Sequence, residues 1–318
     1  MQMEYGKTLV IDGHADILYR MEKEGLRFYE DKDNLHLNYD RIVKAGIDLQ
    51  FFVLFVEPKY TPAEQLTIHL NMIEQFYSEV VGGGKFRPIL KKGDLERNLA
   101  AGYRSGLLSI EGGDCIQSDL RILRTMYRLG VRAMGLTWNQ ANCIADGCGE
   151  KIDRGLTPFG RDVVREMNRL GMIVDVAHLG EKGFWDVMEV AKAPVIASHA
   201  NARAIHDHRR NLHDNQLQAL FKTGGLIGVT FVPMFVGTGD VAISDLMRHI
   251  DHILELGGED HLGIGSDFDG IEWTMTDLRH GGDLPRLQER LFKAYGEDVM
   301  KKIMGGNFKR VIDSILKG

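Results

Sequence analysis

Short apolar runs alternate with amphipathic stretches of helical period along almost the whole chain. Eight runs are rich in β-branched and large apolar residues, as expected of strands: residues 9–14, 49–56, 106–110, 133–137, 172–177, 195–198, 226–231 and 262–265. The stretches between them predict helices at residues 62–80, 119–129, 158–170, 181–191, 215–221 and 244–256. Because no Pro/Ser-rich linker interrupts this alternation, the sequence predicts an α/β fold of the (β/α)8 TIM-barrel type.

The length of the chain also agrees with one closed barrel. A chain of 318 residues could hold two average domains, but such barrels routinely exceed roughly 250 residues, so we expect one domain over residues 1–318. A doubly wound sheet would carry a Gly-rich phosphate loop after its first strand, where this chain reads Ile-Asp-Gly-His-Ala-Asp. We interpret residues 82–85 as a turn, because they lack the Ser/Thr of a P-loop. Asp214 and Ser244 are the expected N-caps of two helices, and residues 305–307 predict the start of a closing helix.

Charge and cysteine content exclude several classes of partner. The chain has 39 basic and 45 acidic residues, a net charge of −6, and no basic block that would bind nucleic acid. We expect no membrane contact, because no apolar stretch approaches about 18 residues and residues 1–7 do not resemble a signal peptide. Three cysteines, Cys115, Cys143 and Cys148, are too few for a disulfide framework. These features predict a reduced, cytoplasmic enzyme.

Residues that bind metals recur at the carboxyl ends of the predicted strands, where barrel enzymes place their chemistry. His14 and Asp16 end the first strand and, being two apart, point to the same side. Four further strands run into a histidine or a carboxylate: Glu111, His178, His199 and Asp267. Imidazole and carboxylate suit zinc, and six such groups exceed what one tetrahedral ion needs. We therefore predict two ions that share a bridging carboxylate, which is a known hydrolytic device.

Each of these residues also has a simpler interpretation. A single histidine at a strand end is more often a satisfied polar residue than a ligand, and a lone His-x-Asp occurs by chance. Glu111 could cap the helix that begins near Ser118. Asp269 could replace Asp267 as the functional carboxylate, because residues two apart in a strand point to the same side. The coincidence of all six groups at one rim is what favours a metal centre.

Six short motifs follow one another in order, and the first four include every candidate metal ligand except Asp267. They are residues 12–16 (DGHAD), 111–113 (EGG), 175–178 (DVAH), 198–203 (SHANAR), 209–211 (RRN) and 265–270 (GSDFDG). In this order, and over essentially the whole chain, they resemble the renal (membrane) dipeptidase family of zinc peptidases. The resemblance implies an amidohydrolase-like barrel with His14 and Asp16 on one metal, His178 and His199 on the other, and Glu111 bridging both. Many related barrels use a modified lysine on strand four for the bridge, but strand four of this chain contains no lysine.

The same resemblance implies a mechanism with two Zn²⁺ per chain and a dipeptide as the small-molecule substrate. A hydroxide that bridges the metals, next to Glu111, would attack the peptide bond. Asp267 would accept the proton and return it to the leaving amine. Arg210 would clamp the substrate's C-terminal carboxylate with two parallel hydrogen bonds, although its basic surroundings alone would predict a surface salt bridge. The family also suggests a homodimer.

One position departs from the family. Members such as the mammalian enzymes carry a histidine after the Leu-Thr that ends strand four, where it contacts the scissile carbonyl, but this chain has Trp138 there. An indole offers one N–H donor and carries no charge, so Trp138 could donate to a carbonyl oxygen or form a wall of the substrate pocket. This departure bears on the substrate and leaves the metal site unchanged. The nearby Asn139, Asn142 and Asp146 are either substrate contacts or turn residues.

The residues leave other functions open. A lactonase, a phosphotriesterase or a deacylase of N-acyl amino acids would keep the metals and cut a different bond. Recognition of a free carboxylate by Arg210 separates a dipeptidase or deacylase from a phosphotriesterase. A noncatalytic binding or scaffold barrel, with Trp138 marking the loss of activity, is a further alternative. Retention of all the ligands argues against it, since unpaired buried charges are costly. Cys143 and Cys148 are interpreted as structural, with a third metal site or a redox pair as the alternative.

Overall fold

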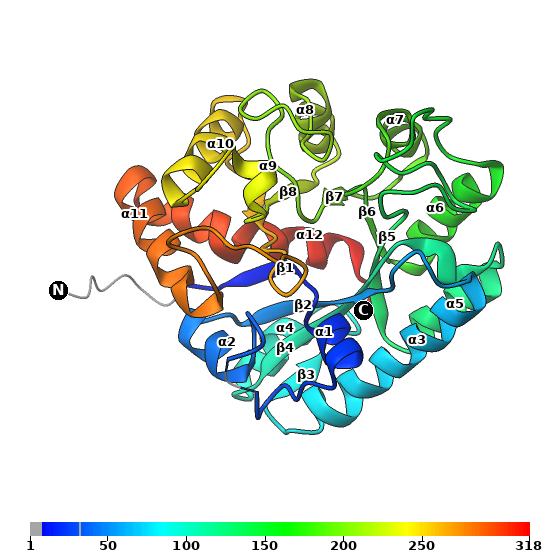
Figure 1. Cartoon of the computed structure of the whole chain (residues 1–318), viewed down its shortest axis with the longest axis horizontal. Helices are drawn as coiled ribbons and strands as arrows, with labels where there is room; N and C mark the ends of the chain where they lie inside the picture. The colour runs from blue at the N-terminus through cyan, green and yellow to red at the C-terminus, as the bar shows by residue number, and fades with distance from the viewer. Residues whose placement is uncertain (1–7, 32) are drawn as a thin grey trace.

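The computed structural model describes residues 8–31 and 33–318, which form a closed barrel of parallel strands surrounded by helices (Figure 1). The strands of the ring are β1 (Ile11–Ala15), β2 (Leu49–Phe55), β4 (Arg104–Glu111), β5 (Val131–Gly135), β6 (Ile173–Asp175), β7 (Val195–Ala197), β8 (Leu226–Val229) and β9 (Leu262–Ile264). The ring closes because β2 pairs with β4 as well as with β1, while β1 also pairs with β9. The expected (β/α)8 TIM barrel is confirmed, and each strand of the ring overlaps one predicted run.

A further strand, β3 (Phe86–Pro88), is not predicted by the sequence. It pairs in parallel with residues 104–106 of β4, before β4 meets β5. With three residues it is too short to show a periodic pattern. It ends in a proline, which has no N–H to donate and is therefore found at the edges and ends of strands.

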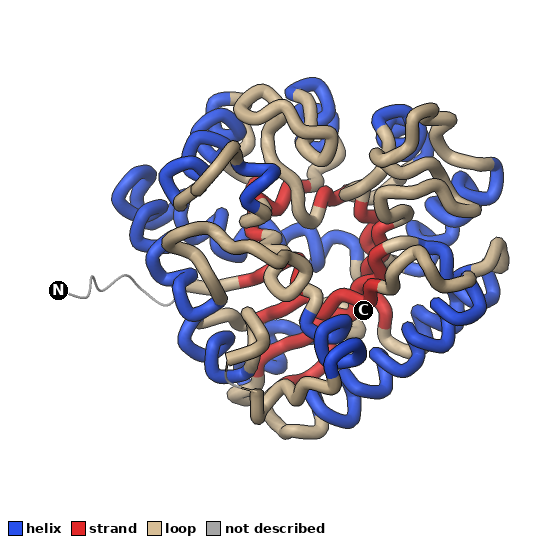
Figure 2. The backbone as a smooth tube through the Cα atoms, viewed as in Figure 1, coloured by secondary structure: helices blue, strands red, loops and turns tan. Residues whose placement is uncertain are grey.

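Helices cover the outside of the barrel (Figure 2). They are α1 (Ile17–Glu24), α2 (Tyr39–Ala45), α3 (Pro62–Gln75), α4 (Asp94–Ala100), α5 (Leu120–Arg128), α6 (Pro158–Leu170), α7 (Glu181–Val190), α8 (Asp214–Lys222), α9 (Pro233–Val236), α10 (Ile243–Glu255), α11 (Leu284–Lys301) and α12 (Asn307–Ile315). All six predicted helices are present, with ends shifted by a few residues. The helices α1, α2, α4 and α9 are missing from the prediction because none exceeds eight residues, too few to show a clear helical period. The 18-residue α11 also has no predicted range, and its pattern is interrupted at Gly296, which has a non-helical φ of 82°.

The N-caps of two helices differ from the prediction. Asp214 is the first residue of α8, because His213 takes the cap position. Ser244 lies inside α10, whose cap is Ala242. The N–H of Ala242 donates to the Asp245 side chain at 2.9 Å, so a carboxylate in the first turn satisfies the N–H of the cap residue.

The amino end of the barrel is closed by α12, which begins at Asn307 as the sequence predicts. Its Phe308 packs so closely on Gly13 and Gly263 that a Cβ atom there would lie 2.2 Å and 2.6 Å from the phenyl ring. Both positions therefore require glycine. Phe308 belongs to an apolar cluster with the first residues of several strands, Ile11 and Leu49 among them. This packing leaves the carboxyl ends of the strands for the functional site.

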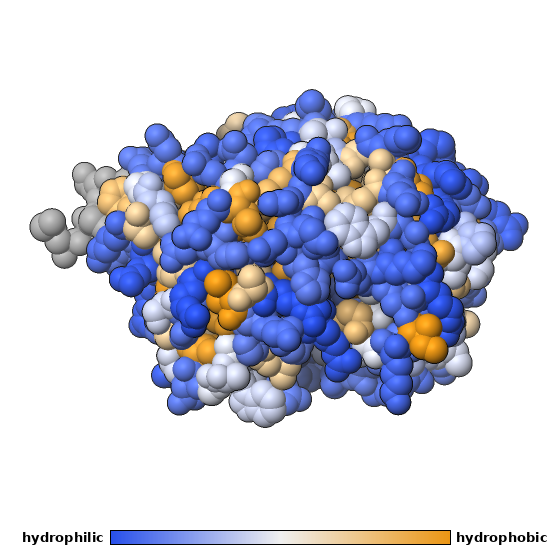
Figure 3. All heavy atoms as spheres, turned by 90° about the horizontal axis from the view of Figure 1, so that it is seen from above, coloured by the Kyte–Doolittle hydropathy of each residue, from blue (hydrophilic) through white to orange (hydrophobic). Residues whose placement is uncertain are grey.

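Surface and cysteine chemistry are unremarkable in the described part of the chain. No helix within residues 8–31 and 33–318 is long and apolar enough to cross a membrane. The expectation about a signal peptide in residues 1–7 falls outside the described residues. The face drawn in Figure 3 is mostly hydrophilic, with apolar side chains in small separate groups. Cys115, Cys143 and Cys148 are free thiols.

Candidate metal centre

The six predicted site residues converge at the carboxyl end of the barrel. His14 lies in β1, and Glu111 is the last residue of β4. The others follow the ends of β1, β6, β7 and β9 by one to three residues: Asp16, His178, His199 and Asp267. All are buried except Asp267, whose side chain is 14 % exposed. The structure therefore brings the complete predicted set together.

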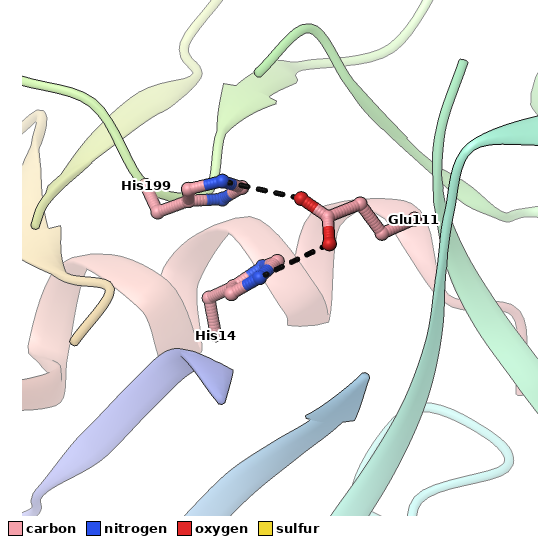
Figure 4. Close-up of side chains that lie close together, drawn as sticks. All are labelled: His14, Glu111 and His199. Carbon is pink, nitrogen blue, oxygen red and sulfur yellow. Dashed lines mark ion pairs between the residues drawn. The ribbon is translucent and has the colours of Figure 1, made fainter. Parts of the chain in front are cut away.

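The carboxylate of Glu111 faces two groups of ligands (Figure 4). Its Oε1 lies 2.8 Å from Nε2 of His178 and 3.3 Å from Nε2 of His199. Its Oε2 lies 3.8 Å from Nε2 of His14. A carboxylate that presents one oxygen to each group can bridge two cations.

The second group surrounds His14. Its Nε2 lies 3.6 Å from Oδ2 of Asp16 and 3.8 Å from Oδ1 of Asp267. Among the described residues, His14 Nε2 and Asp16 Oδ1 are buried atoms without a hydrogen-bond partner. Buried polar atoms are nearly always satisfied, because an unpaired one destabilises the fold. A bound cation would satisfy both atoms.

Hydrogen bonds orient the other two imidazoles. His178 Nδ1 lies 2.9 Å from Oδ1 of Asn139, which can only accept, so Nδ1 carries the proton. His199 Nδ1 lies 2.9 Å from Oγ of Ser198, whose own proton is donated to Asp175 at 2.5 Å. Both Nε2 atoms are therefore lone-pair donors, and they lie 3.0 Å apart. A cation between them would stabilise this arrangement, and it fits the ligand set of a metal site.

Unusual backbone conformations place two of these residues. His178 has a φ of 67° and Asp267 a φ of 62°, in the left-handed region that residues other than glycine seldom adopt. The carbonyl of His178 accepts a hydrogen bond from the Cys148 N–H at 2.7 Å. The N–H of Asp267 donates to the His14 carbonyl at 3.0 Å. Such conformations persist where surrounding contacts fix them, and they cluster at functional sites.

Glycines let the loop after β5 pack against the residue that orients His178. A Cβ at Gly147 would lie 2.1 Å from the Trp138 carbonyl oxygen, and one at Gly149 would lie 2.5 Å from that of Asn139. The N–H of Gly149 donates to the Asn139 carbonyl at 2.8 Å. The loop therefore holds Asn139 in place through backbone contacts that larger residues at positions 147 and 149 would prevent.

The residues that position the candidate ligands were not predicted from the sequence. Besides Asn139, they are Asp175, Ser198, Asp12 and Ser266. Ser266 donates to the Asp12 carboxylate through its N–H at 2.8 Å and its Oγ at 2.7 Å, which ties β1 to the segment carrying Asp267. Polar residues that stand two or three positions before a ligand, inside an otherwise apolar strand, are the signal that could have identified Asp12 and Asp175.

Charges at the site are strongly coupled. Burial lowers the pKa of His14, but the charges of Glu111 and Asp16 outweigh this effect and raise it to about 10. Burial raises the pKa of Glu111 well above its usual range, with His14 opposing the rise. Burial raises the pKa of Asp267 to about 7, with His14 opposing and Asp16 adding to the rise. A divalent cation would stabilise the charged forms of these crowded carboxylates.

Asp267, and not Asp269, is the carboxylate that faces His14. The side chain of Asp269 accepts hydrogen bonds from the N–H groups of His36 at 2.7 Å and Leu37 at 3.0 Å, and so fixes that segment. The alternative of Asp269 relied on strand alternation, which does not apply here because both aspartates follow the end of β9 and both have positive φ.

Arg210 lies beside the candidate metal ligand His199 and is 5 % exposed. Its Nη2 donates to the His199 carbonyl at 3.1 Å, and its guanidinium lies 5.3 Å from the ring of Phe235. Among the described residues, its Nε is a buried donor without a partner. It lines a recess of about 140 Å³ that shares His178 with the main cleft. A surface salt bridge, the simpler interpretation of Arg210, does not describe this buried side chain.

The main cleft has a volume of about 1290 Å³ and is lined by Asp16, Glu111, His178 and Asp267. Trp138 also lines it, with its ring centroid 5.9 Å from that of His178 and 5.3 Å from that of Phe55. The indole thus forms part of the wall next to the metal ligands. Of the other residues in its loop, Asn142 accepts hydrogen bonds from the N–H groups of residues 144 and 145, which is turn chemistry.

A parallel barrel that gathers three histidines and three carboxylates at its strand ends defines a metal-dependent hydrolase. The family model described as membrane dipeptidase (peptidase family M19) matches residues 5–317. This chain belongs to that family, and with it to the metallo-dipeptidases, which are hydrolases.

Individual relatives agree with this assignment. The protein called dipeptidase tcpJ of Claviceps purpurea is 32% identical, over 98% of this chain and 78% of its own length. An uncharacterized protein in the pqqA 5' region of Klebsiella pneumoniae is 34% identical, over 80% of this chain and 97% of its own length.

Solved structures are similar over nearly the whole barrel. A metallo peptidase from Rhodobacter sphaeroides, liganded with a phosphinate mimic of the dipeptide L-Ala-D-Ala, superimposes with a TM-score of 0.91 at 28% identity and covers 97% of this chain and 99% of its own. The M19 metallo peptidase named dipeptidase AC also gives a TM-score of 0.91, at 29% identity over 98% of this chain and 100% of its own.

Proposed function

We propose that the protein is a dipeptidase with two Zn²⁺ per chain, which hydrolyses the peptide bond of dipeptides that have a free C-terminal carboxylate. The observation that carries the proposal is the position of Glu111, whose two oxygens face different ligand groups. His14 and Asp16 would complete one metal position. His178 and His199, with Nε2 unprotonated, would complete the other.

The ions would supply two things that the protein side chains lack, namely a water with a pKa near 7 and a polarised carbonyl. The side chains then have separate tasks. Glu111 holds both positions at a fixed separation. Asp267, on the same cleft, accepts the proton of the attacking water and donates it to the leaving amine, which would otherwise leave poorly. Trp138 offers at most one N–H donor to the developing oxyanion.

Arg210 gives the proposal its specificity for a free carboxylate. Within residues 8–31 and 33–318 its buried Nε–H has no partner, and its positive charge opposes the effect of burial, which raises the pKa values of Glu111 and Asp267. A guanidinium can hold a carboxylate with two parallel hydrogen bonds. A lactone or a phosphotriester offers no such group, so this residue favours peptides and N-acyl amino acids.

A substrate panel with the zinc-loaded protein tests the proposal. L-Ala-L-Ala and L-Ala-D-Ala should both be assayed, since the R. sphaeroides relative binds a mimic of the latter. N-acetyl-alanine, a C-terminally amidated dipeptide and a lactone serve as the competing substrates. We expect cleavage of free dipeptides to exceed that of all three. Faster cleavage of N-acetyl-alanine would make the protein a deacylase, and no cleavage of any dipeptide would refute the proposal.

Metal content and assembly belong to the same proposal. Elemental analysis of protein purified without chelator should find about two zinc equivalents per chain. A stoichiometry of one, or of none, that added zinc does not restore would contradict it. The proposal includes a homodimer, which light scattering on the purified protein would measure directly.

A further inference from the structure

Two of the most exposed apolar side chains of the protein line the cleft. Within residues 8–31 and 33–318, three large apolar residues have more than half of their surface exposed: Ile152 (68 %), Met234 (54 %) and Trp273 (71 %). Met234 and Trp273 line the cleft that Asp267 also lines, whereas Ile152 does not. Apolar surface left in water forgoes the stabilisation of burial, and apolar or aromatic side chains that line a cleft are the usual contacts of a small-molecule ligand.

Met234 is presented by the short helix α9, which follows β8. The helix is anchored, because the carbonyl of Phe235 accepts a hydrogen bond from Nδ2 of Asn211 at 2.8 Å. Phe235 is 9 % exposed and lies 5.3 Å from the guanidinium of Arg210. The neighbours Met234 and Phe235 thus connect the cleft wall to the residue proposed to hold the substrate's C-terminal carboxylate.

Trp273 comes from a different part of the chain, the segment after β9. The segment is held near both ends. The N–H of Gly270 donates to the Asp267 carbonyl at 3.2 Å, and the N–H of Thr276 donates to the Val241 carbonyl at 2.9 Å. Trp273 lies between these two hydrogen bonds, in a segment that begins next to Asp267, the proposed proton carrier.

Another part of the cleft lining, around Glu57, has a different chemistry. Glu57 accepts hydrogen bonds from Tyr19 at 2.7 Å and from Lys23 at 2.9 Å, and Lys59 lies 2.6 Å from its other oxygen. Hydrogen bonds from Lys59, Tyr19 and Lys23 lower the pKa of Glu57 to about 2. This part of the cleft is therefore charged at neutral pH and offers little apolar surface for contact with an apolar side chain.

We propose that Met234 and Trp273 form an apolar platform for the side chain of the substrate's C-terminal residue, so that the enzyme selects dipeptides with a large apolar residue there. The inference rests on the proposed function, because the position of the platform beside Phe235 and Arg210 matters only if Arg210 holds the C-terminal carboxylate. Asp240 and Glu272 also line this side of the cleft, and their charge disfavours an acidic side chain on the platform.

A series of L-Ala-X dipeptides, in which X is Ala, Leu, Phe, Asp or Arg in either configuration, tests the platform. The wild type should have a kcat/KM for X = Phe or Leu at least ~10-fold above that for X = Ala, as expected for added apolar contact. Trp273→Ala and Met234→Ala should each bring this ratio toward one. Because it is a ratio, it does not depend on the fraction of active protein. Ile152→Ala, an equally exposed apolar residue away from the cleft, is the matched control and should leave the ratio unchanged.

Three results would overturn the platform while the dipeptidase stands. The first is a wild type that does not favour large apolar residues. The second is a preference for X = Arg over X = Phe, which would mean that Asp240 and Glu272 determine the specificity of this part of the cleft. The third is a ratio that neither variant changes. A change of oligomeric state in Trp273→Ala, measured by light scattering without a change in the ratio, would assign Trp273 to a subunit contact and also overturn it. Cleavage of no dipeptide at all would refute the proposed function and the platform with it.

Discussion

Glu111 differs from the other ligands in that each of its oxygens faces a different histidine group. Glu111→Gln keeps the shape of the side chain and removes the negative charge that two cations would share. We therefore expect zinc affinity to fall at both positions, measured by elemental analysis and by titration against a competing chelator. His178→Ala is the comparison, since it should weaken mainly one position. Loss of a single equivalent in Glu111→Gln would show that Glu111 is a terminal ligand.

Arg210 should act on substrate binding. Arg210→Lys keeps a positive charge but loses the planar fork, so we expect KM for a free dipeptide to rise by ~10-fold or more with a smaller change in kcat. The same substitution should matter little for a C-terminally amidated dipeptide, which has no carboxylate to hold. Equal effects on the two substrates in steady-state kinetics would remove Arg210 from the carboxylate site.

Asp267 should act on the chemical step. Asp267→Asn removes a proton carrier that is needed as the bond breaks, so kcat should fall by the factor of about 10²–10⁴ that is typical of general acid–base catalysis. Zinc content should stay near that of the wild type. If the variant instead loses one zinc equivalent, Asp267 is a metal ligand. The distance of 3.8 Å between its Oδ1 and Nε2 of His14 would then reflect a shared metal position.

At the scale of the element, the loop after β5 is the part of the fold that orients a ligand from outside the strands. Asn139→Leu removes the acceptor for His178 Nδ1, and we expect zinc affinity at one position to fall by about 10–100-fold, as is typical when a residue that orients a metal-binding histidine is lost. Asn139→Asp keeps an acceptor and should retain most of the affinity. Equal zinc affinity in Asn139→Leu and the wild type would show that the loop holds His178 through its backbone alone.

For the whole molecule, the proposed metal ligands come from the ends of four strands of one ring, β1, β4, β6 and β7, so bound metal should stabilise the entire barrel. Removing the metal with a chelator should lower Tm by roughly 4–6 °C per site, given about 3–4 kcal/mol of linkage for a well-saturated site and an unfolding entropy of about 0.7 kcal/mol/K for a protein of this size. Added zinc should restore it. We propose that residues 1–318 are one domain, which predicts a single calorimetric transition in both forms. An unchanged Tm after confirmed metal loss would show that the barrel does not depend on the site.

Patterns that depend on near neighbours could be predicted from the sequence. The eight strand runs and the six long helices show their periods within ten to twenty residues, and they predicted the barrel. The residues His14, Glu111, His178 and His199 could be assigned to one site because each stands at the end of a predicted strand, and a parallel barrel brings these ends to one rim. The short elements β3, α1, α2, α4 and α9 contain too few residues to show a period.

Only the tertiary structure decided how the site is oriented. That Asp267 faces His14 while Asp269 holds residues 36 and 37 depends on left-handed backbone conformations after β9, which strand alternation cannot anticipate. The burial of Arg210 against Phe235, and the meeting of Met234 and Trp273 in one cleft, join segments far apart in the chain. Local preference acts over one turn or one strand, whereas these contacts arise when the ring closes and loops from different strands pack together.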